Sequence, residues 1–293
     1  MSRYLVPFRL SVDIVFWKKF LQLSLPVGMI SIVSFAYFKM DTILLSVLQG
    51  SSDVGIYNAA YKIIENLTFF PAMIAGLVLP LFSRYIFSEP EKFRLVANKT
   101  FKVFAASVTP LVVGGFLLAE PLVLLLGGEE FQTAALPLRI LIFSLGAIFF
   151  GNFFNAILIA GNLQKRLLAV LFVIALLNIT LNIFLIPIFS FMGAAAVSLA
   201  TEATVAIATA ILSFRFLGYF PASEGLVGIL LSSAIMGIFL TFFSHLSLPI
   251  LLVSAIILYI ATLSLTGSVK KEEIILLFSR KGDDSENTLT PSI

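Results

Sequence analysis

The residues most able to do chemistry in this sequence are ionisable side chains that interrupt long apolar runs. Six of them are singled out here: Lys39, Asp41, Lys62, Glu65, Arg139 and Glu202. A charge at the centre of a membrane helix costs about 2.5–3.5 kcal/mol on insertion scales, so such residues indicate ligand binding, ion coupling or buried pairing. The cationic groups could hold an anionic ligand, and the carboxylates could hold a proton or a cation.

Four of these charges are expected at one depth on neighbouring helices. With a rise of 1.5 Å per residue, Lys39 and Asp41 fall about 6–9 Å outward from the centre of the first apolar run. Lys62 and Glu65, three residues apart on one helix face, fall about 5–9 Å outward from the centre of the second. We therefore expect a buried pair of Lys62 with Glu65 or with Asp41, which either fixes helix register or serves a ligand.

The other two charges have simpler alternative explanations. Glu202 is expected near the middle of its run and has no basic partner on its own helix, so it is either a protonated, packed carboxyl group or a proton or cation site. Arg139 lies about 12 Å toward the outside and could instead extend to the lipid headgroups. Six asparagines inside apolar runs, among them Asn178 and Asn182, could line a wet cavity or join helices.

The elements that position these residues follow from composition. The chain has 293 residues, of which 59% are hydrophobic and 12% charged, and its mean hydropathy is +1.07. A soluble domain is about 45–50% apolar and about 25% charged, so the composition predicts an all-α, polytopic membrane bundle. Eight runs are long enough to span a bilayer: 23–48, 54–82, 100–126, 134–160, 167–189, 193–217, 225–246 and 249–265.

The positive charges predict orientation. Sixteen of the nineteen Lys and Arg residues fall before the first run, in the even-numbered connections or the run ends next to them, or after the last run, and the odd-numbered connections have none. This asymmetry predicts a multi-pass protein of the cytoplasmic membrane with both termini in the cytoplasm. We divide the chain into a cytoplasmic or interfacial segment (1–22), a transmembrane domain of eight spans (23–266) and a partly disordered cytoplasmic tail (267–293). A short interfacial helix is expected over 11–22, and a capping box at Ser88 starts a helix before the third span.

Several functions are disfavoured by what the sequence lacks. It has no Cys and one His, which excludes disulfides, thiolate metal sites and multi-histidine zinc sites. No phosphate-binding glycine loop, HExxH or GxSxG motif is present. We therefore expect no enzyme, no catalytic residues, no metal and no cofactor. A net charge of +3 gives no reason to expect nucleic acid.

A series of local patterns resembles a known family. Trp17, Lys18 and Lys19 precede Leu-Ser-Leu-Pro at 23–26, Asp-Thr-Ile-Leu-Leu occupies 41–45, and Val-Gly-Ile-Tyr-Asn-Ala-Ala-Tyr-Lys occupies 54–62. Leu-Pro-Leu-Phe-Ser-Arg follows at 79–84, Leu-Arg-Ile-Leu at 138–141 and Met-Gly-Ala-Ala at 192–195. In order and spacing, the series resembles the C-terminal part of O-antigen-type polysaccharide repeat-unit flippases, in the multidrug/oligosaccharidyl-lipid/polysaccharide exporter superfamily.

The resemblance implies a two-lobed helical transporter that moves undecaprenyl-diphosphate-linked oligosaccharides across the cytoplasmic membrane by alternating access. It implies a basic central cavity, to which we assign Lys62, Lys39, Arg139, Tyr57 and Tyr61 as substrate-binding residues. Asp41, Glu65 and Glu202 are assigned to charge pairing or ion coupling. The implied partners are a lipid-linked glycan, membrane lipids, and glycosyltransferases or a polymerase.

The chain departs from the family in length, because such flippases have twelve to fourteen spans and a further six-span lobe before the matched region. We therefore expect a truncated or split chain, or another chain that supplies the first lobe. Two alternative functions stay open: a cation-coupled multidrug exporter of the same superfamily, and a non-transporting scaffold subunit of a glycan-assembly complex.

Overall fold

The computed structural model describes residues 13–268, and within them the chain is helical without strands. The elements are α1 (Ile14–Leu48), α2 (Ser51–Leu67), α3 (Phe69–Tyr85), α4 (Pro90–Leu117), α5 (Ala119–Gly127), the 3-10 helix η1 (Glu129–Ala134), α6 (Ala135–Ala160), α7 (Gln164–Leu217), α8 (Leu226–Phe242) and α9 (Leu248–Leu265). The predicted all-α bundle is confirmed. The predicted disorder of the tail and all of the tail's cations fall outside the described residues.

Six helical segments in the described part of the chain are long and apolar enough to cross a membrane. They are Ile14–Leu48, Ser51–Tyr85, Pro90–Leu117, Glu129–Ala160, Gln164–Leu217 and Leu248–Leu265. A further helix, Leu226–Phe242, is apolar but has 17 residues. Helices satisfy their own backbone hydrogen bonds, as a hydrocarbon environment requires, so the protein is a multi-pass membrane protein.

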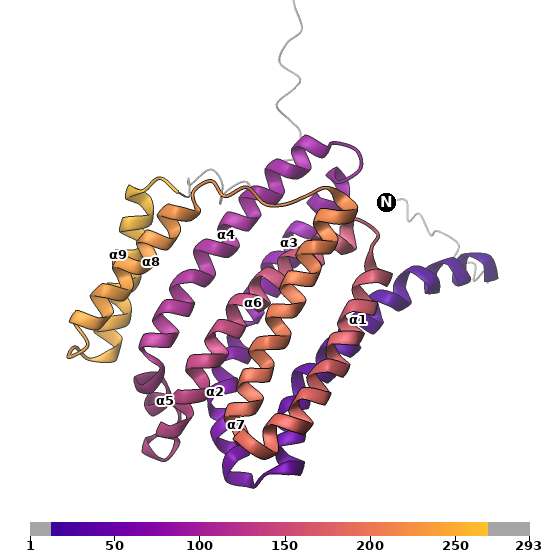
Figure 1. Ribbon diagram of the computed structural model, residues 1–293. Helices are drawn as coiled ribbons and strands as arrows, with labels where there is room; N and C mark the ends of the chain where they lie inside the picture. Colours follow the sequence, from indigo (N-terminus) through magenta and orange to yellow (C-terminus); the bar gives the residue numbers. More distant parts are fainter. Residues whose placement is uncertain (1–12, 269–293) are drawn as a thin grey trace, which may run out of the picture.

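One of these segments, α7, is a hairpin of two helices. Its 54 residues would extend about 80 Å, far more than the 30 Å of a bilayer core. Ser190 has non-helical dihedral angles (φ 49°, ψ −133°), and the chain reverses there (Figure 1). Gly193 permits the tight return, because a Cβ atom on it would lie 2.6 Å from the carbonyl oxygen of Leu185. We call residues 164–189 the first arm and residues 191–217 the second arm.

Helix α6 is the centre of the bundle and packs against α2, α3, α4 and α7. Its buried Phe149 and Phe153 interlock with Phe104 of α4, and Phe153 also meets Phe82 of α3 edge-on. Aromatic pairs of this kind add about 0.5–1.5 kcal/mol beyond area burial. Helix α1 packs on α7 at one side of the bundle, while α8 and α9 pack on each other and α8 on α4 at the other side (Figure 1).

Two local expectations differ from the structure. Residues 14–22 are helical as expected, but they are the first turns of α1, which is capped by the Asp13 carboxylate and continues unbroken through Pro26 into the first span. Ser88 does not form a capping box. Its hydroxyl donates to the Arg84 carbonyl, and α4 instead begins with Pro90 in its first turn. Proline suits that position because its missing N–H would have no intrahelical partner.

Candidate functional site

The first group of site residues is a pair of lysines that share one carboxylate. Lys39 of α1 donates to Glu65 of α2 at 2.5 Å, and the Lys62 ammonium lies 3.6 Å from the other Glu65 oxygen. The lysine side chains are 35% and 69% exposed, and that of Glu65 is 34% exposed. The cluster thus has a net charge of +1 and an open surface. The expected pairing of Lys62 with Glu65 is present, but the Lys62 side chain is mostly exposed rather than buried, and Lys39 lies nearer to Glu65 than Lys62 does.

The second group surrounds Asp41, which is 3% exposed. Its carboxylate accepts hydrogen bonds from Asn182 at 2.7 Å, from Asn178 at 3.1 Å and from the Tyr57 hydroxyl at 3.1 Å. The two asparagines are four residues apart on the first arm and therefore face α1 together. The alternative pairing of Lys62 with Asp41 is absent, because Lys62 pairs with Glu65 and the Asp41 carboxylate is occupied by these three donors.

Asp41 connects several elements of the bundle. Tyr57 comes from α2, the asparagines from the first arm, and Asn178 also donates to the Thr201 hydroxyl of the second arm at 3.4 Å. The Asn182 side-chain oxygen is buried and has no hydrogen-bond partner among the described residues. Buried polar groups are normally paired, so an unpaired oxygen beside a carboxylate marks a place where an added proton or cation would find a ligand.

The third group is Glu202 with Tyr37. The Tyr37 hydroxyl donates to the Glu202 carboxylate at 2.6 Å, and the residues are 7% and 4% exposed respectively. Tyr37 precedes Asp41 by four residues on α1, and Glu202 follows Thr201 on the second arm. Two buried carboxylates therefore lie along the same contact between α1 and α7.

The remaining predicted residues lie apart from the exposed lysines. Tyr57 and Tyr61 are buried and stacked at 5.4 Å, and the Tyr61 hydroxyl donates to the Phe38 carbonyl. In this conformation both tyrosines belong to the packing around Asp41 and present no open face to a substrate. Arg139 of α6 lies over Phe116 of α4, with 6.0 Å from guanidinium carbon to ring centroid. No contact in the described structure joins Arg139 to the lysine cluster.

The sequence singled out Asn178 and Asn182 as residues that could line a cavity or join helices, but it gave them no partner, and it did not single out Thr201. The available signal was the spacing of four between two amides in an apolar run, which places both on one helix face. That signal does not name a partner, since the asparagines lie 137 and 141 residues from Asp41 in sequence. No group of three or more His, Cys, Asp or Glu side chains suited to a metal ion occurs within residues 13–268.

Comparisons with known proteins agree with this architecture. Residues 1–136 match a sequence family described as "Polysaccharide biosynthesis protein". The fold is similar to that of the lipid II flippase MurJ in an inward closed conformation, with a TM-score of 0.70 at 16% identity over 92% of this chain and 58% of the MurJ chain. No curated protein sequence matches the chain significantly.

Two further solved structures share the fold. A transporter of the MOP superfamily from Pyrococcus furiosus has a TM-score of 0.57 at 18% identity, over 84% of this chain and 62% of its own. An outward-facing MATE-family multidrug resistance transporter of the same superfamily has a TM-score of 0.57 at 20% identity, over 76% and 53%. The chain thus spans less than two thirds of each matched structure.

These comparisons show that the described part of the chain has the fold of these membrane transporters. The match of residues 1–136 to a polysaccharide biosynthesis family agrees with the resemblance to polysaccharide flippases found in the sequence. The matched structures are transporters and not enzymes, in agreement with a sequence that lacks catalytic motifs.

Proposed function

We propose that this chain forms part of a flippase that moves undecaprenyl-diphosphate-linked oligosaccharides across the cytoplasmic membrane by alternating access. The observation that carries the proposal is the open cluster of Lys39, Lys62 and Glu65 on helices that match a polysaccharide biosynthesis family. We further propose, from the distribution of Lys and Arg, that both chain termini are cytoplasmic.

The exposure of the lysine cluster indicates that this face of α1 and α2 borders water or further protein and not lipid. An ammonium group in hydrocarbon costs several kcal/mol, and Lys62 is 69% exposed within an apolar helical segment. A lipid-facing position is therefore unfavourable. A face that borders an aqueous cavity, closed on its far side by further protein, removes this cost and leaves the two lysines open to an anionic headgroup.

The chemistry of the cluster suits a diphosphate. Two ammonium groups can each donate to phosphate oxygens, and charge-assisted hydrogen bonds of this type are stronger than neutral ones. Between substrates, Glu65 holds both lysines, so the site stays ordered without a ligand. A diphosphate that enters competes with Glu65 for the lysines, and its release allows the carboxylate to pair with them again.

The Asp41 network offers a route for ion coupling. Asp41 accepts hydrogen bonds from α2 and from the first arm of α7, and Asn178 links it to the second arm, so a change in its charge alters the contacts between these elements. We propose that a proton or a monovalent cation binds there, with Asp41, Asn178, Asn182 and Thr201 as the residues that would hold it. Glu202 with Tyr37 supplies a second buried carboxylate on the same contact.

A chromosomal Lys62→Gln substitution in the native host tests the substrate role. We expect loss of surface glycan and accumulation of the lipid-linked precursor inside the cell, at normal protein level in the membrane. The matched control is Lys19→Gln, which removes an exposed lysine from the start of α1 and should leave export intact. Export at the wild-type level in the Lys62→Gln strain would refute the proposed contact.

A cation-coupled multidrug exporter is the second candidate, because MATE transporters share the fold and buried carboxylates lie between α1 and α7. It predicts dye or drug efflux from cells that express the chain, with no change in surface glycan on deletion. A glycan defect without any efflux activity would exclude this candidate.

A further inference from the structure

The first turns of α1 carry large apolar side chains that remain exposed. Residues 13–22 are all exposed, whereas Pro26 and Ile30 further along the helix are buried. Six of the exposed side chains are large and apolar: Ile14, Val15, Phe16, Trp17, Phe20 and Leu21. Figure 1 shows this indigo start of α1 directed away from the other helices. The lysine cluster and the Asp41 network do not involve this segment.

Helix α1 is too long for a single bilayer crossing. Its 35 residues extend about 52 Å, whereas the hydrocarbon core is about 30 Å thick. About 20 residues, counted back from Leu48, are enough to cross the core, and these include Lys39 and Asp41. The turns before Pro26 therefore lie beyond the core. A straight continuation of the span would leave their apolar side chains in water.

Pro26 allows the start of α1 to turn away from the direction of the span. Proline has no N–H to donate to the carbonyl four residues earlier, here that of Gln22, and it therefore bends a helix. The bend falls where the exposed turns give way to the buried part of α1. The first turns can thus lie along the membrane surface while the rest of the helix crosses the bilayer.

The aromatic and basic side chains lie on opposite sides of these turns. With 3.6 residues per turn, Phe16 and Phe20 form one row, and Lys18 and Lys19 point to the other side. The two phenylalanine rings are 6.3 Å apart, and Trp17 meets Phe20 edge-on at 5.9 Å. A helix with this arrangement suits the headgroup region, where rings face the acyl chains and ammonium groups face the phosphates.

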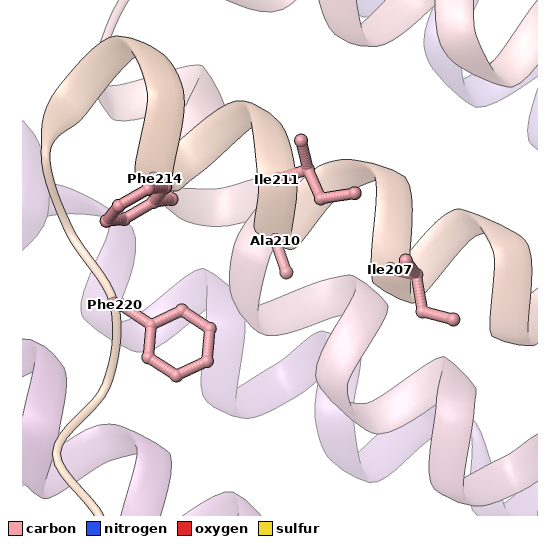
Figure 2. Close-up of a pocket in the computed structure, with 5 residues that line it drawn as sticks. All are labelled: Ile207, Ala210, Ile211, Phe214 and Phe220. Carbon is pink, nitrogen blue, oxygen red and sulfur yellow. The ribbon is translucent and has the colours of Figure 1, made fainter.

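A second exposed apolar surface provides a contrast. It is a groove of about 560 Å³ on the second arm of α7, lined by Ile207, Ala210, Ile211, Phe214 and Phe220. Figure 2 shows the first four along one side of the helix and Phe220 on the connecting segment opposite them. No charged side chain lines the groove, so nothing there selects a headgroup. The start of α1 combines an apolar face with two cations.

We propose that residues 14–22 are a membrane-surface anchor that prefers anionic lipids, with the aromatic face at the acyl boundary and both lysines at lipid phosphates. Basic residues on a surface helix attract anionic headgroups. Neither Lys18 nor Lys19 forms an ion pair with a carboxylate among the described residues, so both ammonium groups are open to phosphates. Because α1 is unbroken, the anchor also fixes where the helix with Lys39 enters the bilayer. The anchor does not depend on which substrate the protein transports.

Trp17 allows a direct test, because it is the only tryptophan in the sequence and its fluorescence reports on this segment alone. The purified full chain is placed in vesicles of equal amounts of dioleoylphosphatidylglycerol and dioleoylphosphatidylcholine. In one preparation the phosphatidylglycerol carries brominated acyl chains, and in the other the phosphatidylcholine does, because bromine quenches tryptophan on contact. We expect quenching by the brominated phosphatidylglycerol to be at least twice that by the brominated phosphatidylcholine, with little quenching by iodide in the water.

A charge variant tests the preference for anionic lipid. Lys18→Gln/Lys19→Gln keeps the aromatic face, so Trp17 should stay shielded from iodide. The ratio of quenching by the two brominated lipids should fall to about one, because the cations that select the headgroup are gone.

The matched control is Lys165→Gln/Arg166→Gln, which removes two adjacent exposed cations from the start of α7. The next residue, Leu167, belongs to the same apolar cluster as Ile30, which is about 20 Å along α1 from Trp17. This variant should therefore keep the wild-type ratio.

A second pair of variants tests the aromatic face. Phe16→Ser should raise quenching of Trp17 by iodide about twofold, because the segment loses part of its apolar row. Val15→Ser is the control, since Val15 is three and four residues before the two lysines and lies on their side of the helix. It should leave iodide quenching nearly unchanged.

Three results in the wild-type protein would overturn the proposal. Equal quenching by the two brominated lipids would remove the preference for anionic lipid. Strong quenching by iodide would place the start of α1 in water. Trp17 that is shielded from iodide and quenched by neither brominated lipid would show that protein, from a partner or a second copy, covers the aromatic face instead.

Discussion

Asn182 donates a hydrogen bond of 2.7 Å to the carboxylate of Asp41, although the two residues are 141 positions apart in sequence. The bond joins the C-terminal part of α1 to the first arm of α7 inside the bundle. Asn178 makes a parallel bond to the same carboxylate oxygen. A buried carboxylate that depends on donors from another helix couples the positions of the two helices, because separating them would leave the charge without partners.

Removal of the Asn182 amide should therefore destabilise the protein. In Asn182→Ala, Asp41 loses its shortest hydrogen bond, and bonds to charged groups are worth about 1.5–3 kcal/mol. We expect a loss of that size in the free energy of unfolding, and a lower midpoint of thermal unfolding in detergent. The control is Asn152→Ala, since the Asn152 amide donates to Ile148 within its own helix. Equal losses in both variants would contradict a special role for Asn182.

The sequence located these charges but not their partners. The depth of Lys39 and Glu65 followed from the rise per residue, and the two side chains do meet between antiparallel helices. The same arithmetic gave Lys39 and Asp41 nearly the same depth. It did not show which neighbouring helix each side chain meets, although residues two apart on a helix point to nearly opposite faces. Which face meets α2 and which meets α7 is decided by tertiary packing, which is not encoded in the local pattern of either helix.

The helices themselves were easier to predict than their ends. Continuous apolar runs predict helices that satisfy their own backbone groups. The return of the chain near Ser190 was expected from the break between the runs 167–189 and 193–217. The unbroken passage of α1 from Ile14 into the first span was not expected, because hydropathy changes near residue 23 while the helix continues. Ser88 satisfied the sequence pattern of a capping box, but its hydroxyl finds the Arg84 carbonyl instead.

The second prediction concerns the single donor to Glu202. Tyr37→Phe removes the only side-chain hydrogen bond found for that carboxylate among the described residues, and preserves the ring. We expect a cost of about 1–3 kcal/mol, the usual penalty for a buried polar group left unpaired. The double variant Tyr37→Phe/Glu202→Leu removes both polar groups and should recover part of the loss. The measurement is thermal unfolding of the purified protein. If the losses of Tyr37→Phe and of Glu202→Leu alone simply add up in the double variant, the bond contributes nothing.

The third prediction concerns the turn of the α7 hairpin, where Ser190 lies at positive φ and its hydroxyl donates to Asp53 at 2.5 Å. The backbone conformation favours glycine, and its cost for other residues is of order 1–3 kcal/mol. Ser190→Ala loses the hydrogen bond and keeps the strain, whereas Ser190→Gly loses both. We therefore expect the alanine variant to unfold at a lower temperature than the glycine variant. The reverse order would show that the turn is not strained.

The fourth prediction separates a structural role from a substrate role for Lys39. The single variants Lys39→Glu and Glu65→Lys each place like charges at the contact between α1 and α2, and both should lower thermal stability and glycan export. The double variant Lys39→Glu/Glu65→Lys restores an opposite-charge pair, so its thermal stability should return toward the wild-type value. If Lys39 only fixes helix register, export returns as well. If Lys39 contacts the diphosphate, the inverted pair puts a carboxylate where the phosphates bind, and export stays low although the protein is stable. Full recovery of export would therefore remove Lys39 from the proposed substrate site and leave Lys62 as the cation to be tested there.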